Sequence, residues 1–272
     1  MNTRAIRALV IKDLRVISRS RTIMMTLILV PFIMMILMPT AFTLGIRFAT
    51  FQASDLEDLQ QLFEAMPPGL IEKFSELSDD QLFLTLTVVY MFAPLYLIVP
   101  LMVSSVIAAD SIVGEKERKT LEALLHSPLT DAEIFLAKVL SAWIPAVTVS
   151  IVAFIIYGVI ANVLGYPVMG RVFFPNLMWI VLVFWVAPAA SGLGLGTMVL
   201  VSTKVKTFQD AYQLGGMVVI PVVALVFGQL GGVIYLSVGF VFLMGLFLWL
   251  LNGVLLWFGI RLFERDSLQA QI

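Results

Sequence analysis

The chain has 272 residues, of which 60% are hydrophobic and only 13% are charged. Soluble domains are about half apolar and about a quarter charged, so this composition indicates an integral membrane protein. The lack of cysteine excludes disulfides and thiolate metal sites, and one histidine argues against a histidine metal site. The net charge of −1 says nothing about partners.

Six stretches are long and apolar enough to cross a bilayer, because a spanning helix needs about 20 apolar residues. The uncharged stretch from 212 to 260 is too long for one span, and the glycine-rich turn at 228–232 divides it into two. The predicted fold is therefore all-α, a single transmembrane domain over 1–272. Its six spans are expected at about 22–46, 83–109, 132–164, 174–201, 212–230 and 233–260.

The basic residues predict the orientation, because lysine and arginine gather on the cytosolic side. Fourteen of the 17 fall in the N-terminal segment, the 110–138 connector, the 202–210 connector and the C-terminal tail. The remaining three are Arg47, Lys73 and Arg171. We therefore expect a multi-pass protein of the cell membrane with both termini in the cytosol.

Residues 47–82 form an acidic segment that this topology places outside the cytosol. Apolar residues at helical spacing, interrupted by Pro67-Pro68-Gly69, predict two short helices lying over the outer mouth. A lid or partner site and a plain solvated connector both remain open for this segment.

Residues 1–21 contain a basic amphipathic helix, which favours a place in the membrane interface. Its apolar face holds Ile6, Leu9, Val10, Leu14 and Ile17, and its polar face holds Arg4, Lys12, Arg15 and Arg19. Asp13 falls within the apolar face, where it needs a partner. The helix is either a lever that carries a cytosolic contact to the first span or a simple interfacial anchor.

Catalytic motifs are missing from the sequence. There is no phosphate-binding G-x-x-x-x-G-K-[ST] loop, no H-E-x-x-H and no G-x-S-x-G. Gly192-Leu-Gly-Leu-Gly196 lies inside an apolar span, where small residues indicate close helix packing rather than a phosphate site. The span centres also lack ionisable residues, which argues against proton or sodium coupling within this chain. We therefore predict no catalytic and no metal-binding residue, and the cargo site is unknown.

The segment 110–131 is a water-facing connector between two spans. From Gly114 its sequence predicts a helix up to Pro128, supported by Glu115 with Lys119 and by Arg118 with Glu122 at i,i+4 spacing. One side of this helix carries Glu117, Leu121, Leu124 and Leu125. Thr130 or Asp131 then caps the next helix.

These residues resemble the signature of ABC transporter permeases of the ABC-2 exporter type. The resemblance is carried by Gly114-Glu115-Lys116-Glu117-Arg118, Thr120-Leu121-Glu122, Leu124-Leu125, Ser127-Pro128, Glu133 and Lys138. The six-span layout and the amphipathic N-terminal helix match as well. Two residues depart from the pattern, because Lys119 and Ala137 stand where the family often has glycine.

The resemblance implies a cytosolic coupling helix that docks on a separate ATP-hydrolysing subunit. The contact residues it implies are Gly114, Glu115, Glu117, Arg118, Thr120, Leu121, Glu122, Leu124, Leu125 and Pro128. A second, smaller contact would comprise Lys204, Lys206, Phe208 and Asp210. It also implies a second permease copy or paralogue, with ATP and Mg held by the partner subunit and no cofactor in this chain.

The expected function is that of the permease subunit of an ABC exporter, which is not itself an enzyme. Uncharged spans favour an apolar or amphiphilic cargo, such as a drug or a lipid-linked molecule. A sodium-exporter-like permease and a non-transport membrane scaffold or assembly factor remain as alternatives. An intramembrane enzyme is disfavoured by the missing catalytic groups.

Overall fold

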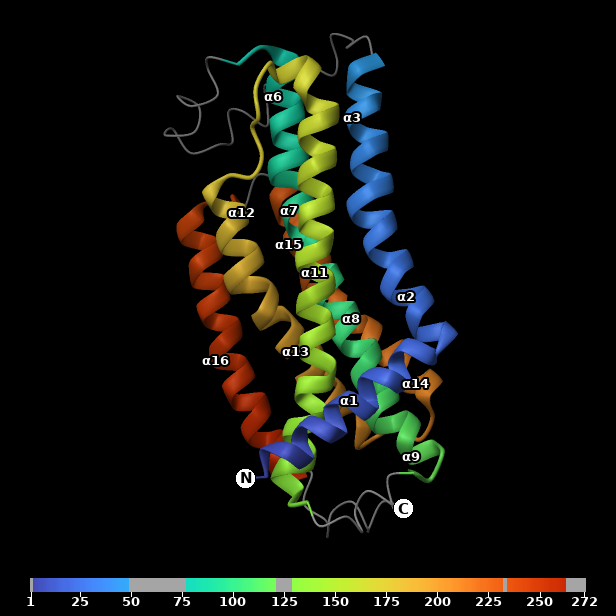
Figure 1. Cartoon of the computed structure of the whole chain (residues 1–272). Coiled ribbons are helices and arrows are strands. Elements are labelled where there is room, and N and C mark those ends of the chain that lie inside the picture. Colours follow the sequence, from blue (N-terminus) through green and yellow to red (C-terminus); the bar gives the residue numbers. More distant parts are fainter. Residues whose placement is uncertain (1, 49–76, 121–128, 232–233, 263–272) are drawn as a thin grey trace.

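The computed structural model describes residues 2–48, 77–120, 129–231 and 234–262 (Figure 1). Its elements in this part of the chain are all helical. Six helical stretches are long and apolar enough to cross a membrane, which confirms the predicted fold class. They are Arg21–Gly45, Asp79–Glu117, Asp131–Met169, Leu177–Ser202, Phe208–Leu230 and Val238–Gly259.

Helix α1 (Thr3–Arg19) runs obliquely across the lower end of the bundle in Figure 1, beside the lower part of α11. The side chain of Asn2 caps it by accepting a hydrogen bond from the Ala5 N–H. Ile6, Leu9, Val10 and Ile17 are buried against the bundle, as the apolar pattern predicts. We refer to this end as the α1 end and to the opposite one as the far end.

The first span consists of α2 (Arg21–Phe32), η1 (Ile33–Leu37) and α3 (Met38–Phe48). The π-helical turn η1 begins two residues after Pro31, which lacks an N–H and so cannot donate to the Leu27 carbonyl in the preceding turn.

The second span is longer at both ends than the 83–109 that hydropathy predicts. It comprises α6 (Asp79–Thr85), η2 (Leu86–Met91), α7 (Phe92–Tyr96), α8 (Ile98–Ala109), η3 (Asp110–Gly114) and α9 (Glu115–Glu117). Ser78 and Gln81 form a capping box at its start. The first residues expected in the connector thus continue the second span.

Helix α11 (Asp131–Met169) is the third span. Thr130 caps its start in a capping box with Glu133. Of the two caps that the sequence predicts, Thr130 and Asp131, the structure has Thr130. Gly170 ends it with a φ of 64°, a left-handed conformation that glycine adopts without strain. At about 1.5 Å per residue, its 39 residues extend roughly 58 Å, well beyond a hydrocarbon core of about 30 Å.

The fourth span is built from α12 (Leu177–Val181), η4 (Leu182–Val186) and α13 (Ala187–Ser202). The fifth comprises α14 (Phe208–Gly216), η5 (Met217–Val219) and α15 (Ile220–Leu230), and the sixth is α16 (Val238–Leu262). Many apolar side chains of the last two spans are exposed, including Phe227 at 69% and Leu250 at 65%. Such surfaces suit lipid or another membrane helix.

The π-helical turn η2 is stabilised by aromatic donors from neighbouring spans. A π turn displaces the regular hydrogen bonds of the helix and leaves carbonyls to be satisfied from outside. The Tyr157 hydroxyl donates to the Val88 carbonyl, and the Trp179 indole N–H donates to the Val89 carbonyl over 2.7 Å. The rings of Tyr157 and Trp179 stack with centroids 5.1 Å apart. The irregular turn is therefore a packed part of the core.

The glycines of α13 allow the close helix packing that the sequence predicts. A Cβ on Gly194 would lie 2.3 Å from Ser104 Oγ and 2.6 Å from the Leu101 carbonyl oxygen of α8. A Cβ on Gly192 would meet the side chain of Asn252 in α16, whose amide donates to the Ala189 carbonyl over 2.7 Å. Each of these two glycines thus brings a different span against α13.

Candidate functional site

The predicted coupling residues lie at the α1 end, where the second span leaves the bundle. Gly114 ends η3, Glu115 and Glu117 form α9, and Arg118 and Lys119 make a turn before Thr120. Lys119 has a φ of 58°, a left-handed conformation that ends the helix. The Thr120 hydroxyl donates to the Glu115 carbonyl over 3.2 Å and so satisfies one carbonyl of the final turn.

The prediction of one continuous helix from Gly114 to Pro128 is wrong at this turn. The left-handed residue interrupts the helix, and Glu115 points back into the bundle instead of pairing with Lys119. The remaining predicted contact residues, Leu121, Glu122, Leu124, Leu125 and Pro128, lie outside the described residues.

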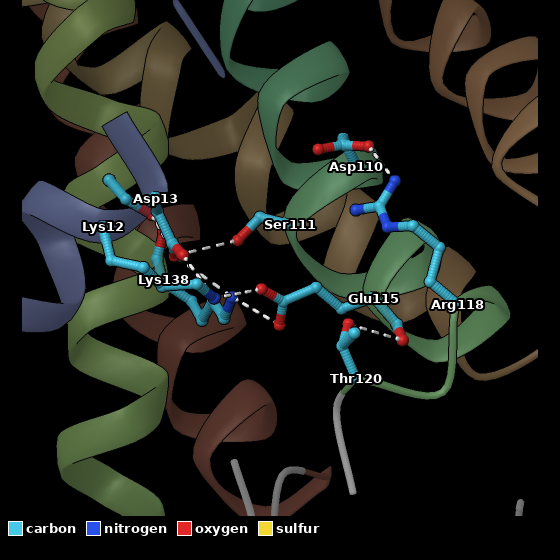
Figure 2. A network of polar contacts seen from close by, with 9 residues as sticks. Lys12, Asp13, Asp110, Ser111, Glu115, Arg118, Thr120 and Lys138 are labelled. Atoms are coloured by element: carbon cyan, nitrogen blue, oxygen red, sulfur yellow. Dashed lines mark hydrogen bonds and ion pairs between the residues drawn. The ribbon is translucent and has the colours of Figure 1, made fainter. Parts of the chain in front are cut away.

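Four charged side chains meet where α1, α9 and α11 converge, as Figure 2 shows. We call Lys12, Asp13, Glu115 and Lys138 the charge quartet. Lys138 Nζ lies 3.1 Å from Asp13 Oδ2 and 2.7 Å from Glu115 Oε2. Lys12 Nζ lies 3.1 Å from Asp13 Oδ1 and 2.7 Å from Glu115 Oε1. Two cations thus alternate with two anions, and the formal charges cancel.

Three members of the quartet are buried. The side chains of Lys138, Asp13 and Glu115 are 2%, 4% and 9% exposed, whereas that of Lys12 is 48% exposed. Removing one partner of a buried ion pair costs about 3–5 kcal/mol, because it leaves an uncompensated charge away from water. The quartet therefore stabilises one arrangement of its three helices, because arrangements that separate the ion pairs are higher in free energy.

Asp13 receives the partner that its place on an apolar face demands. The hydroxyl of Ser111 in η3 lies 3.4 Å from its Oδ2 (Figure 2). The hydroxyl of Ser141 in α11 lies 3.3 Å from the same oxygen. At the N-terminal end of α1, the Asn2 N–H donates to Glu133 Oε1 over 2.5 Å. Helix α1 is thus attached to α11 at its N-terminus and again at Asp13.

Charge also governs the protonation of Lys12. Burial disfavours its charged form, but the hydrogen bond and charge of Glu115, together with Asp13, outweigh burial and raise the pKa of Lys12 above its usual value. Lys12 is therefore a cation at neutral pH, as the charge balance of the quartet requires.

A second ion pair stabilises the turn at the end of the second span. Arg118 Nη1 lies 3.0 Å from Asp110 Oδ1, and the hydrogen bond to Asp110 raises the pKa of Arg118. Gly114 lies between them, since a Cβ there would come within 2.8 Å of Asp110 Oδ1 and 3.2 Å of the Arg118 guanidinium. Glycine at 114 thus leaves room for this ion pair.

A hydrogen bond joins the described residues of the two predicted contact segments. The backbone N–H of Phe208 donates to Glu117 Oε2 over 2.8 Å. Asp210 belongs to the first turn of α14, which is capped by Thr207, and Lys204 and Lys206 are exposed just before it. The structure therefore brings the described residues of both segments to the same end of the bundle.

Sequence reasoning did not assign Lys12, Asp13, Ser111, Ser141 or Lys138 to the site. The placement of Asp13 on an apolar face was a usable signal, and it predicted a partner. Nothing local identified Lys138 as that partner, because the two residues are 125 positions apart in the sequence. Across the described ranges, no three histidine, cysteine or acidic side chains are grouped so as to hold a metal ion.

Comparison with known proteins identifies the family of the chain. No curated protein and no solved structure matches the chain. The model of the ABC-2 family transporter proteins matches residues 7–268, which takes in all six spans and the charge quartet. The chain therefore belongs to the ABC-2 family of transporter proteins, as a permease subunit.

Proposed function

We propose that this permease moves an apolar or amphiphilic cargo out of the cytosol, using ATP hydrolysed on a separate subunit that also holds Mg. In this proposal the α1 end faces the cytosol of the cell, where the partner ATPase docks on the segment after Thr120 and on α14. A second copy of the permease, or a paralogue, completes the complex. The basic residues of the connectors and the N-terminal segment support this orientation.

The observation that carries the proposal is the charge quartet. Glu115 stands five residues before Thr120, after which the docking segment begins, and it pairs with Lys12 of α1 and Lys138 of α11. Because buried ion pairs strongly disfavour separation, a displacement of α9 would move α1 and α11 with it. This favours the lever function of α1 over the simple anchor.

The permease and its partner ATPase, reconstituted in liposomes, provide the test. Leu121→Asp with Leu124→Asp should abolish co-purification of the ATPase, because charge would replace the apolar contact. Lys138→Met should leave co-purification intact but uncouple ATP hydrolysis from cargo efflux. Arg7→Gln, an exposed change in α1 outside the quartet, is the matched control for both measurements.

Three results would contradict this assignment. The first is unchanged ATPase binding in the leucine double variant. The second is normal coupling in Lys138→Met. A purified complex that lacks any ATPase would instead favour a membrane scaffold.

A further inference from the structure

A recess of about 360 Å³ opens at the far end of the bundle, between the second span and the end of the third. Its volume falls within the roughly 300–1,000 Å³ typical of small-molecule sites. It is separate from the charge quartet, since its residues come from the start of the second span, the end of α11 and the segment before α12. The lining comprises Leu77, Thr85, Val89, Tyr90, Met169, Arg171, Val172, Phe173 and Asn176.

The wall of the recess is held in place by Asn162 of α11. Its Oδ1 accepts hydrogen bonds from the Phe173 and Phe174 N–H groups over 3.1 and 3.2 Å, and its amide donates to the Phe174 carbonyl over 2.6 Å. The Phe173 ring packs over Gly165, where a Cβ would come within 2.6 Å of it. The segment after α11 is therefore pre-organised, which lowers the entropic cost of binding.

The opposite wall is fixed as well. Gln81 Nε2 donates to the Val168 carbonyl over 3.1 Å and so ties the start of the second span to the end of α11. The Val89 carbonyl is bonded to the Trp179 indole, and the ring of Tyr90 lies 5.3 Å from that of Tyr235. Both walls thus consist of restrained residues.

The polar chemistry of the recess favours an anion. Arg171 is its single charged lining residue, and no ion pair or hydrogen bond to another described residue occupies the guanidinium. Asn176 uses its Oδ1 to cap α12 by accepting from the Trp179 N–H, which leaves its amide as a hydrogen-bond donor. Guanidinium and amide donors match carboxylate and phosphate oxygens.

Besides Thr85 and Tyr90, whose side chains carry hydroxyls, the rest of the lining is apolar. Val89 and Met169 are buried, and Phe173 contributes an aromatic face. We propose that this recess binds an amphiphile with an anionic head, a carboxylate or a phosphate ester. The head lies against Arg171 and Asn176, and the apolar portion lies along Val89, Met169 and Phe173.

Photo-crosslinking of the full chain in nanodiscs of zwitterionic lipid tests this site without the ATPase. The probes are three diazirine lipids: a fatty acid, phosphatidylglycerol, and phosphatidylcholine as the zwitterionic control. Peptide mapping should show that an anionic probe labels residues 77–90 and 169–176 well above phosphatidylcholine. If only the fatty-acid probe labels these peptides, the ligand is a free amphiphile. If only the phosphatidylglycerol probe labels them, the ligand is a bilayer lipid.

Substitution of the cation sharpens the test. Arg171→Gln should lower labelling roughly tenfold, because one charge-assisted contact is lost, whereas Arg171→Lys should retain most of it. Arg7→Gln removes an exposed cation at the α1 end and should leave the labelling of these peptides unchanged. Equal labelling by phosphatidylcholine, no labelling of these peptides, or labelling that survives Arg171→Gln would overturn the proposal. None of these outcomes depends on ATP-driven transport.

Discussion

Single residues at the α1 end decide how the second span terminates. Lys119 adopts a φ of 58°, a conformation that places a Cβ against the backbone and that glycine adopts without this cost. Lysine at this position therefore retains the strain of the left-handed backbone.

Replacing Lys119 with glycine should raise the free energy of unfolding of the purified permease by about 1 kcal/mol, since the strain of the left-handed backbone is relieved. A fluorescence-based melting curve in detergent measures the change. Lys116→Gly is the matched control. Because Lys116 lies inside α9, where glycine is a poor helix former, this variant should lose a similar amount of stability. Equal destabilisation by both variants would contradict the strain at 119.

The losses of stability caused by substituting single members of the charge quartet should be far from additive. Lys138→Met leaves buried carboxylates uncompensated, and Asp13→Leu leaves an excess cation, so each should destabilise the permease by about 3–5 kcal/mol. The double variant should cost much less than the sum of the two. Lys12→Met provides the comparison, since this half-exposed partner should contribute at most about 1 kcal/mol.

A double-mutant cycle of melting curves measures this coupling. Additive losses in the Asp13 and Lys138 variants would show that the two side chains act independently and that the quartet does not tie α1 to α11.

At the scale of elements, the spans are packed through small residues and through irregular turns. The π-helical turn η2 and the close contact of α13 with α8 both require matched partners from other spans. Hydropathy alone predicts neither the irregular turns nor the partners of each span, because it reports composition along the chain and not the neighbours across it. The small residues of Gly192–Gly196 within an apolar run did predict close helix packing at this place.

Gly194→Ala should therefore be costly, because its Cβ would overlap the Leu101 carbonyl oxygen, a backbone atom that cannot swing aside. We expect a loss of about 3 kcal/mol in the melting curve. Gly253→Ala in α16 is the matched control, since a Cβ there meets nothing within 4 Å. That change should be neutral or slightly stabilising, because alanine is the better helix former. Similar behaviour of the two variants would be inconsistent with the tight contact.

At the scale of the whole molecule, the six spans and the buried face of α1 follow from local patterns, and the sequence predicted both. The charge quartet does not, because its members are brought together by tertiary packing from positions 12 to 138. The break at Lys119 also escaped prediction, since its neighbours are good helix formers and a lysine carries no turn signal. The second and third spans extend further at both ends than hydropathy indicates, because the polar ends of a helix continue beyond the apolar core, whereas the fourth and sixth spans begin later than expected.

The lack of native cysteine makes the orientation directly testable. Val172→Cys at the far end and Lys206→Cys at the α1 end introduce single thiols at exposed positions. A membrane-impermeant maleimide added to intact cells should label only the thiol at 172, and permeabilised cells should show both. Labelling of the thiol at 206 in intact cells would invert the proposed topology.

The wide separation of Asp13 and Lys138 in the sequence has a consequence for biosynthesis. Helix α1 leaves the ribosome long before α11, so the carboxylate of Asp13 stays exposed to water until the third span is inserted. Helix α1 can then dock only after the third span has been inserted and has brought Lys138 beside Asp13. A nascent chain arrested before Lys138 should leave α1 open to added protease, and a chain arrested after the third span should protect it. Protection in the shorter chain would show that α1 docks without its counter-ion.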